Sequence, residues 1–169
     1  IAAGAGVDPA MIRHFFKDKE GLFAATVTGR TAIAERLGAA FSGDPAGLGA
    51  RVAEAYLGLW DDDATGPILR AVARTAFTSE KSAGMLRDLL AARIGAAIDP
   101  EFVAGEEMPL RMMLAGAQLL GIAVTRNLAR AQPLVDIERA RLVAIVAPTV
   151  QQLLTGALPP DDGIARELS

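Results

Sequence analysis

The sequence predicts an all-α protein, and three observations point to that fold class. Of its 169 residues 51% are hydrophobic, largely Ala, Leu, Val and Ile, while aromatic residues make up only 5%. Apolar residues recur with helical spacing, and no long segment alternates apolar and polar residues as a half-buried strand would. Clusters of proline, glycine and aspartate divide the chain into segments of helix length.

The helices expected in the first part of the chain begin at recognisable capping signals. Asp8-Pro9 supplies an N-cap and then proline at the first helical position, and opens a helix that ends at Phe16. Asp18 can cap a longer helix over about residues 19–41. Segment 42–47 has the composition of a loop, and a helix over about 48–60 follows it.

The second part of the chain shows the same alternation of helices and breaks. Asp61-Asp62-Asp63 and Gly66-Pro67 separate the preceding helix from two more. Asp99-Pro100 and the segment 105–109 form another connection, and Thr155-Gly156 is a typical helix stop. Pro148 is expected to kink the last helix. The helices predicted here cover about residues 67–78, 80–98, 109–130 and 136–154.

Composition excludes several classes of site. With 17 Lys and Arg against 20 Asp and Glu, the net charge is −3, so any contact with nucleic acid must be local. Cysteine is absent and there is one histidine, which removes disulfides, thiolate sites and His₂ or His₃ metal sites. The acidic run 61–63 suggests a hard-cation site, but consecutive side chains diverge, and a solvated capping loop is the favoured interpretation. We expect no catalytic residue, no metal and no cofactor, and therefore no enzyme.

The most apolar run does not predict a membrane span. It extends from Leu110 to Val124, but Arg111, Gln118 and Arg126 leave it shorter than the roughly 18–20 residues that a span needs. A helix buried on most sides by protein is the expected alternative. The first residues also lack the basic and apolar segments of a signal peptide. We therefore expect a soluble, cytoplasmic protein that does not contact a membrane.

The first sixteen residues have the pattern of a helix-turn-helix. Residues 1–7 read as the end of a helix, Gly6 supplies a tight turn, and residues 8–16 form a second short helix. Ile12 and Phe16 share its inward face, which leaves small and basic side chains to face outward. An ordinary helical hairpin with solvated charges shows the same spacing and stays open at this point.

A longer run then resembles a known family. The sequence IAAGAGVDPAMIRHFFKDKEGLF, Ile1 to Phe23, resembles without gaps the DNA-binding signature of the tetracycline-repressor (TetR) family. The passages QLLGIA at 118–123 and VAPTV at 146–150 resemble one C-terminal subtype found in bacterial members. The resemblance implies a partial helix-turn-helix region with its connecting helix at residues 1–41, and a helical-bundle domain for ligand binding and dimerisation at 42–169. The family's DNA-binding unit has three helices, and its first helix is expected to precede this sequence.

The resemblance also implies which side chains approach DNA. Lys19 would hold a phosphate at a helix N-terminus. The family often has tyrosine where Arg13 stands and a small hydroxyl residue where Met11 stands. Because arginine can bond guanine through two hydrogen bonds, a different base preference is expected. His14 is either a phosphate donor or a solvated surface group. The residues expected to approach bases or phosphates are Pro9, Ala10, Met11, Arg13, His14 and Lys19.

The remaining helices carry candidates for a small-molecule pocket. Apolar walls with a few polar groups are typical of such pockets, although methionine and aromatic stripes also serve as ordinary core. The family resemblance implies a pocket inside the bundle for an unknown effector. The candidate residues are Tyr56, Trp60, Arg74, Phe77, Met85, Met112, Met113, Gln118, Arg126 and Asn127.

The last two helices predict a homodimer. One has many small residues and the other is apolar over much of its circumference, more than a small monomer can bury. A twofold four-helix interface would bury both and would place two recognition helices roughly 34–36 Å apart along DNA. The residues expected in the interface are Ala115, Leu119, Ile122, Leu142, Val146, Val150 and Leu153.

Together these features predict a ligand-responsive repressor that binds a palindromic double-stranded DNA operator as a homodimer. Two alternatives stay open on the sequence alone. One is a helical module that binds a small molecule or a protein partner without binding an operator. The other is a small all-α enzyme, which paired carboxylates converging in a cleft would favour.

Overall fold

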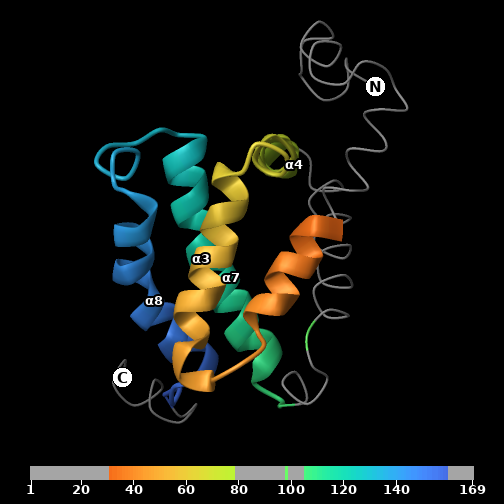
Figure 1. The fold of residues 1–169 in the computed structure, drawn as a ribbon, viewed down its shortest axis with the longest axis vertical. Coiled ribbons are helices and arrows are strands. Elements are labelled where there is room, and N and C mark those ends of the chain that lie inside the picture. The colour runs from red at the N-terminus through yellow and green to blue at the C-terminus, as the bar shows by residue number, and fades with distance from the viewer. Residues whose placement is uncertain (1–30, 79–97, 99–104, 160–169) are drawn as a thin grey trace, which may run out of the picture.

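The computed structural model describes residues 31–78, 98 and 105–159. These residues are helical and contain no strand, which confirms the predicted fold class (Figure 1). A helix occupies residues 31–40, and the short 3₁₀ helix η2 follows at Pro45–Gly47. The longer helices are α3 (Leu48–Asp61), α4 (Gly66–Thr78), α7 (Met108–Asn127) and α8 (Arg139–Thr155). The helices expected at 8–16 and 80–98 lie outside the described residues, apart from residue 98.

The expected helix boundaries need correction mainly between α7 and α8. Helix α7 ends at Asn127 rather than Arg130, and α8 begins at Arg139 rather than Asp136. Residues 128–138 form a turn in which Arg130 has a positive φ of 51°. This turn is held by the Arg126 guanidinium, which donates hydrogen bonds to two of its carbonyl groups. The left-handed backbone at Arg130 is incompatible with a continued α-helix, so α7 ends before it.

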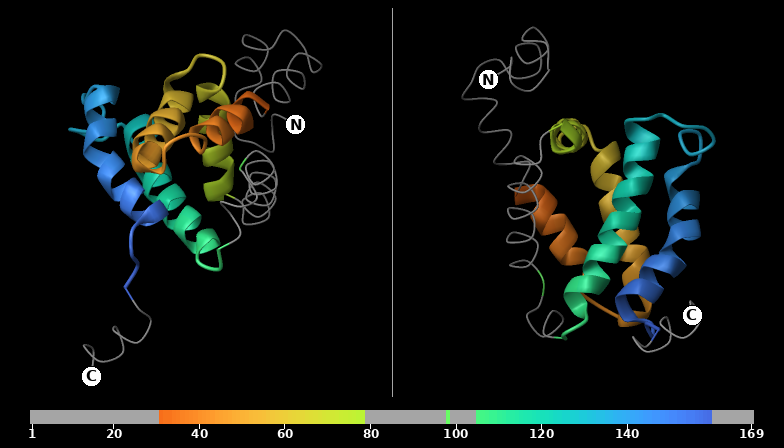
Figure 2. Two further views of the ribbon diagram at one scale, coloured as in Figure 1. Left: turned by 60° about the horizontal axis from the view of Figure 1, so that its bottom comes forward. Right: turned by 180° about the vertical axis from the view of Figure 1, so that it is seen from behind.

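Helix α3 lies at the centre of the described residues. In Figure 1 it stands between the helix at residues 31–40 and α8, with α7 behind it, and α4 crosses one end of the group. The view from behind in Figure 2 shows the same order with α7 in front. Helix α3 packs against α8 over most of its length and also contacts α4 and α7.

The apolar core has two parts. The larger cluster joins α3, α7 and α8, and Trp60, Leu119 and Val150 are almost completely buried in it. The smaller cluster consists of Ile33, Leu37 and Leu59, and it holds the helix at residues 31–40 against α3. Tyr56 and Leu69 contact both clusters. The larger cluster comprises Ala40, Leu48, Val52, Ala53, Leu57, Trp60, Ala73, Ala115, Leu119, Ala123, Leu142, Val146, Val150 and Leu154.

The contact between α3 and α8 is closest at Gly49. A Cβ added there would lie 2.5 Å from the Ala147 carbonyl oxygen and 2.5 Å from the Gln151 nitrogen, so the two backbones approach each other directly. The Gly49 N–H also donates to Oε1 of Gln151 at 2.6 Å, and Nε2 of Gln151 donates to the Pro45 carbonyl at 2.8 Å. Helix α8 therefore supplies the side-chain cap that Gly47, the N-cap residue of α3, lacks.

We predict that Gly49→Ala destabilises the protein, because the new methyl group must separate α3 from α8. The expected loss is about 1–3 kcal/mol of unfolding free energy, as for other overpacked sites. Gly58→Ala on the same helix is the matched control, since its Cβ would meet nothing closer than a glutamate oxygen at 4.0 Å. That change should stabilise α3 by up to about 1 kcal/mol. Urea unfolding of both variants would measure the difference, and equal stabilities would contradict the close contact.

Candidate functional site

The residues predicted to approach DNA lie outside the described part of the chain. Pro9, Ala10, Met11, Arg13, His14 and Lys19 all fall within residues 1–30. Two pocket candidates are also untested, because Met85 and the side chain of Phe77 are not among those described. These assignments remain predictions.

The other pocket candidates differ in their surroundings within the described part of the chain. Trp60 is 1% exposed and belongs to the core, whereas Met113 is 65% exposed. Arg126 braces the turn before α8, and Asn127 donates to the Ala123 carbonyl of its own helix at 3.0 Å. Arg74 is exposed on α4. These side chains therefore have separate surroundings, and some have evident structural roles.

Two of the predicted pocket residues share an unusual property, and a third lies beside one of them. Nε1 of Trp60 and Oε1 of Gln118 are buried and have no hydrogen-bond partner. Burial raises the pKa of Tyr56 to about 12, and the neighbouring Trp60 side chain lowers it by a smaller amount. The Trp60 N–H nevertheless does not have the geometry of a hydrogen bond to any partner. The two aromatic rings lie 6.4 Å apart. A buried donor and a buried acceptor without partners each cost about 1–3 kcal/mol, so they are groups that a polar ligand can satisfy.

The residues predicted for a dimer interface pack against other residues of the same protomer. Ala115, Leu119, Leu142, Val146 and Val150 are buried in the larger core cluster. The other two candidates, Ile122 and Leu153, are partly buried against the same cluster. The faces of α7 and α8 that carry these residues pack on α3, so a charge placed there would enter the core of one protomer.

A different face of the same helices is exposed and apolar. Leu110, Met113, Leu114 and Leu120 of α7 and Ile145 of α8 are 40–65% exposed. Each of the four α7 residues lies three, four or seven positions from another of the four, so they share one side of that helix. The expectation that this run is buried on most sides is therefore wrong, since only 17% of its most apolar window is buried. By length and composition alone, α7 would also reach across a membrane.

Helix α7 also has two exposed glycine residues. Gly116 and Gly121 are exposed in the middle of α7, and a Cβ at either would meet nothing within 4 Å. Glycine inside a helix costs about 1 kcal/mol relative to alanine. The described part of the protomer gives no packing reason for either glycine.

Asp62 organises the turn between α3 and α4. Its Oδ1 accepts hydrogen bonds from the N–H groups of Ala64 at 2.9 Å and Thr65 at 3.0 Å, and Thr65 Oγ1 donates to the Leu59 carbonyl at 2.7 Å. The two backbone N–H groups lower the pKa of Asp62, and Arg36 adds a smaller effect. This geometry confirms the prediction of a capping loop. Within the described ranges, no group of three potential ligands could hold a metal ion.

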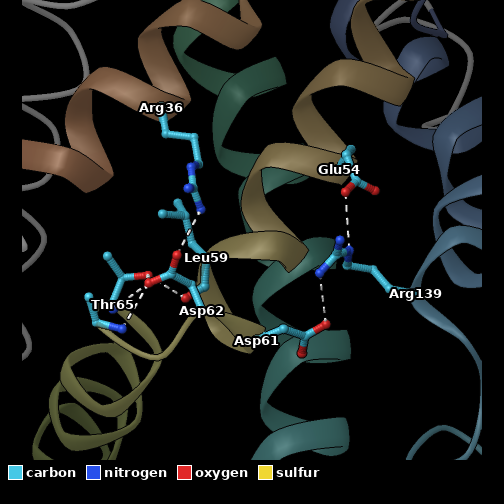
Figure 3. Close-up of polar contacts among 8 residues, drawn as sticks. Arg36, Glu54, Leu59, Asp61, Asp62, Thr65 and Arg139 are labelled. Atoms are coloured by element: carbon cyan, nitrogen blue, oxygen red, sulfur yellow. Dashed lines mark hydrogen bonds and ion pairs between the residues drawn. The ribbon is translucent and has the colours of Figure 1, made fainter.

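Two arginines join this region to other helices, as Figure 3 shows. Arg36, on the helix at residues 31–40, lies 3.5 Å from Oδ2 of Asp62. Arg139, at the start of α8, lies 3.1 Å from Glu54 and 3.4 Å from Asp61. These ion pairs link residues far apart in the sequence, and no local pattern predicts them.

Comparison with known proteins places this architecture in a family. Residues 46–154 match the sequence model described as the tetracyclin repressor-like C-terminal domain. The chain is also similar to the crystal structure of a TetR-family regulator from Streptomyces coelicolor A3, with 31% sequence identity and a TM-score of 0.57. That similarity covers 90% of this chain and 79% of the other. No curated protein matches the sequence. The family match over most of the body and the similarity to a solved regulator show that this chain belongs to the TetR family of transcriptional regulators.

Proposed function

We propose that the protein is a ligand-responsive repressor that binds a palindromic operator as a homodimer in the cytoplasm. The main support for this proposal is that two separate parts of the chain are similar to the TetR family. Ile1 to Phe23 resembles the family's DNA-binding signature, and residues 46–154 match its C-terminal domain. We assign DNA binding to residues 1–41, including the connecting helix, and effector binding and dimerisation to residues 42–169.

The recognition helix at residues 8–16 would enter the major groove of each half-site. Arg13 would read a base, because its guanidinium can donate two hydrogen bonds to guanine. Lys19 would bind a phosphate and position the helix without reading sequence. Pro9, Ala10, Met11 and His14 would complete the contact surface.

The homodimer would form through the exposed face of α7 and α8. Soluble proteins rarely leave a large contiguous apolar patch uncovered, and Leu114, Leu120 and Ile145 are all at least 40% exposed. Gly116 and Gly121 would let a second copy approach the α7 backbone closely. We therefore keep the helices that the sequence selected for the interface, but assign the contact to this outer face.

The effector would bind within the bundle near Trp60 and Gln118. An effector that offers an acceptor to the Trp60 N–H or a donor to Gln118 Oε1 would satisfy a group that has no partner. Repression would end if the bound effector favoured a spacing of the two recognition helices that does not fit the operator. DNA must then weaken effector binding by the same factor.

The first test of this function is operator selection with the full-length protein. Selection from a random duplex library should return an inverted repeat. Arg13→Ala should relax the base preference at one position per half-site. It should also cost about 1–3 kcal/mol of binding free energy per site. Lys19→Ala should weaken binding to all DNA sequences about equally. It should also reduce the slope of log affinity against log salt concentration by about one. If no sequence is enriched, a partner-binding module without operator binding becomes the better assignment.

The dimer is tested by placing charge on the exposed face. Ile145→Glu and Leu120→Glu should give monomers in light scattering, because a stable interface of at least about 1,200 Å² would have to bury the new carboxylate. Ala140→Glu is the control, since Ala140 is exposed on another side of α8. Dimers that persist in both apolar-face variants would show that this face is not the interface.

The unpartnered amide of Gln118 leads to a stability prediction. Gln118→Met keeps the length of the side chain and removes the buried Oε1, so the ligand-free protein should gain about 1 kcal/mol of unfolding free energy. That gain corresponds to a rise in Tm of about 2–4 °C for a domain of this size. Gln132→Met, at an exposed position, should give no such rise. An unchanged Tm for Gln118→Met would mean that water already satisfies this oxygen.

A further inference from the structure

The helix at residues 31–40 is joined to the beginning of α3 at its C-terminal end. Nε of Arg51, on α3, donates to the Ala40 carbonyl at 3.1 Å, and Ala40 is buried in the larger core cluster. The connecting loop fits closely around this guanidinium, since a Cβ added at Gly47 would lie 2.9 Å from its Nη1. The last carbonyls of a helix have no partner within it, and a cation near them is favoured. Arg51 therefore fixes this end of the helix on α3.

Asp62 presents a carboxylate in a fixed position at the other end of α3. Its Oδ1 accepts hydrogen bonds from the N–H groups of Ala64 and Thr65. Thr65 is 3% exposed, and its Oγ1 ties the turn to α3 through the Leu59 carbonyl. The two N–H groups also lower the pKa of Asp62, so the carboxylate is charged at neutral pH. The turn uses Oδ1, whereas Oδ2 lies 3.5 Å from the guanidinium of Arg36 (Figure 3).

The ion pair of Arg36 and Asp62 selects one position of the helix but is weak enough to open. Beside it, the Leu59 side chain packs against Ile33 and Leu37 of the same helix. Apolar contact is not directional, so it tolerates small shifts of the helix. The Arg36 and Asp62 side chains are 49% and 31% exposed. Pairs of this kind change an equilibrium by about fivefold or less, and salt weakens them.

We propose that Asp62 is a positioning residue that sets the angle of the helix at residues 31–40 on α3. Arg51 holds the end of that helix at Ala40, and the Asp62 carboxylate holds Arg36 one turn earlier. When the ion pair opens, the helix pivots about Ala40 and its N-terminal end moves furthest. The consequence for DNA rests on the proposed function. Because residues 1–41 are assigned to DNA binding, the ion pair sets where the DNA-binding region lies relative to α7 and α8.

The experiment measures the position of this helix in the full chain, without DNA. The chain contains no cysteine, so Ala32→Cys and Arg141→Cys, both at exposed positions, provide two unique sites for spin labels. Ala32 lies on the helix at residues 31–40, and Arg141 lies on α8. Labelled protein is diluted into an excess of unlabelled protein, so that the distances measured by double electron–electron resonance come from single protomers.

Two substitutions open the ion pair in different ways. Asp62→Asn keeps an oxygen for the turn and places an N–H donor where Oδ2 faced the guanidinium, while Arg36→Gln removes the cation. Each should broaden the distance distribution or shift its maximum by about 1–2 Å, the usual size of helix shifts at packed interfaces. The double variant should give the same distribution as either single variant, because both changes remove one contact.

Salt gives a readout that loss of the turn alone does not produce. Raising the salt concentration from about 0.1 M to about 1 M shortens the Debye length from about 10 Å to about 3 Å. In the labelled protein without further change, this should shift or broaden the distribution as the substitutions do. In Asp62→Asn and Arg36→Gln it should have no such effect, since the pair is already open.

Two controls separate positioning from a general effect of charge. Asp63→Asn makes the same chemical change at the neighbouring exposed carboxylate and should leave the distribution unchanged. Arg36→Lys keeps the cation and should restore the original maximum. Circular dichroism checks that each variant is folded, and Arg36→Gln decides alone if Asp62→Asn does not fold, because Arg36 takes no part in the turn.

The proposal is overturned if folded Arg36→Gln has the original distance distribution, or if Asp63→Asn changes the distribution equally. It is also overturned if salt moves the helix equally with and without the ion pair. None of these outcomes depends on operator binding. Failure of the operator selection would therefore leave the positioning role intact, and failure of the positioning role would leave the proposed function intact.

Discussion

The direct backbone contact between α3 and α8 at Gly49 determines most of the structure around it. Only glycine permits α3 to lie against the Ala147 carbonyl of α8, and Gln151 then caps α3 from the other helix. Once these two helices are joined, Leu142, Val146 and Val150 must point into the core. Ile145, on another side of α8, is then left outside the core.

The exposed apolar face of α7 and α8 has the composition of an interface with a second copy. Trp60 and Gln118 each have a buried polar atom without a partner. Such an atom costs stability until a ligand or a water molecule satisfies it.

The sequence predicts where the helices lie more accurately than it predicts which of their faces are buried. The stop signal Thr155-Gly156 is local, and α8 ends at Thr155, within one residue of expectation. Segment 42–47, expected as a loop, contains the short helix η2 instead. Helix α7 is apolar around most of its circumference, so periodicity alone does not tell that Leu119 faces the core while Leu120 faces outward. Arg126 donates to the turn before α8, and Arg36 and Arg139 form ion pairs with distant residues. These partners are set by tertiary packing, so no local pattern predicts them.

The helix at residues 31–40 is the element whose attachment is weak enough to respond to a ligand. Its apolar contacts among the described residues are the small cluster of Ile33, Leu37 and Leu59, and Ala40, which is buried in the larger cluster. Each buried aliphatic side chain contributes at most about 1.5–3 kcal/mol. Moving a two-state equilibrium from 1:99 to 99:1 requires about 5.5 kcal/mol of differential binding. The two quantities are of the same order, so the proposed effector would need a differential affinity of this size to reposition the helix.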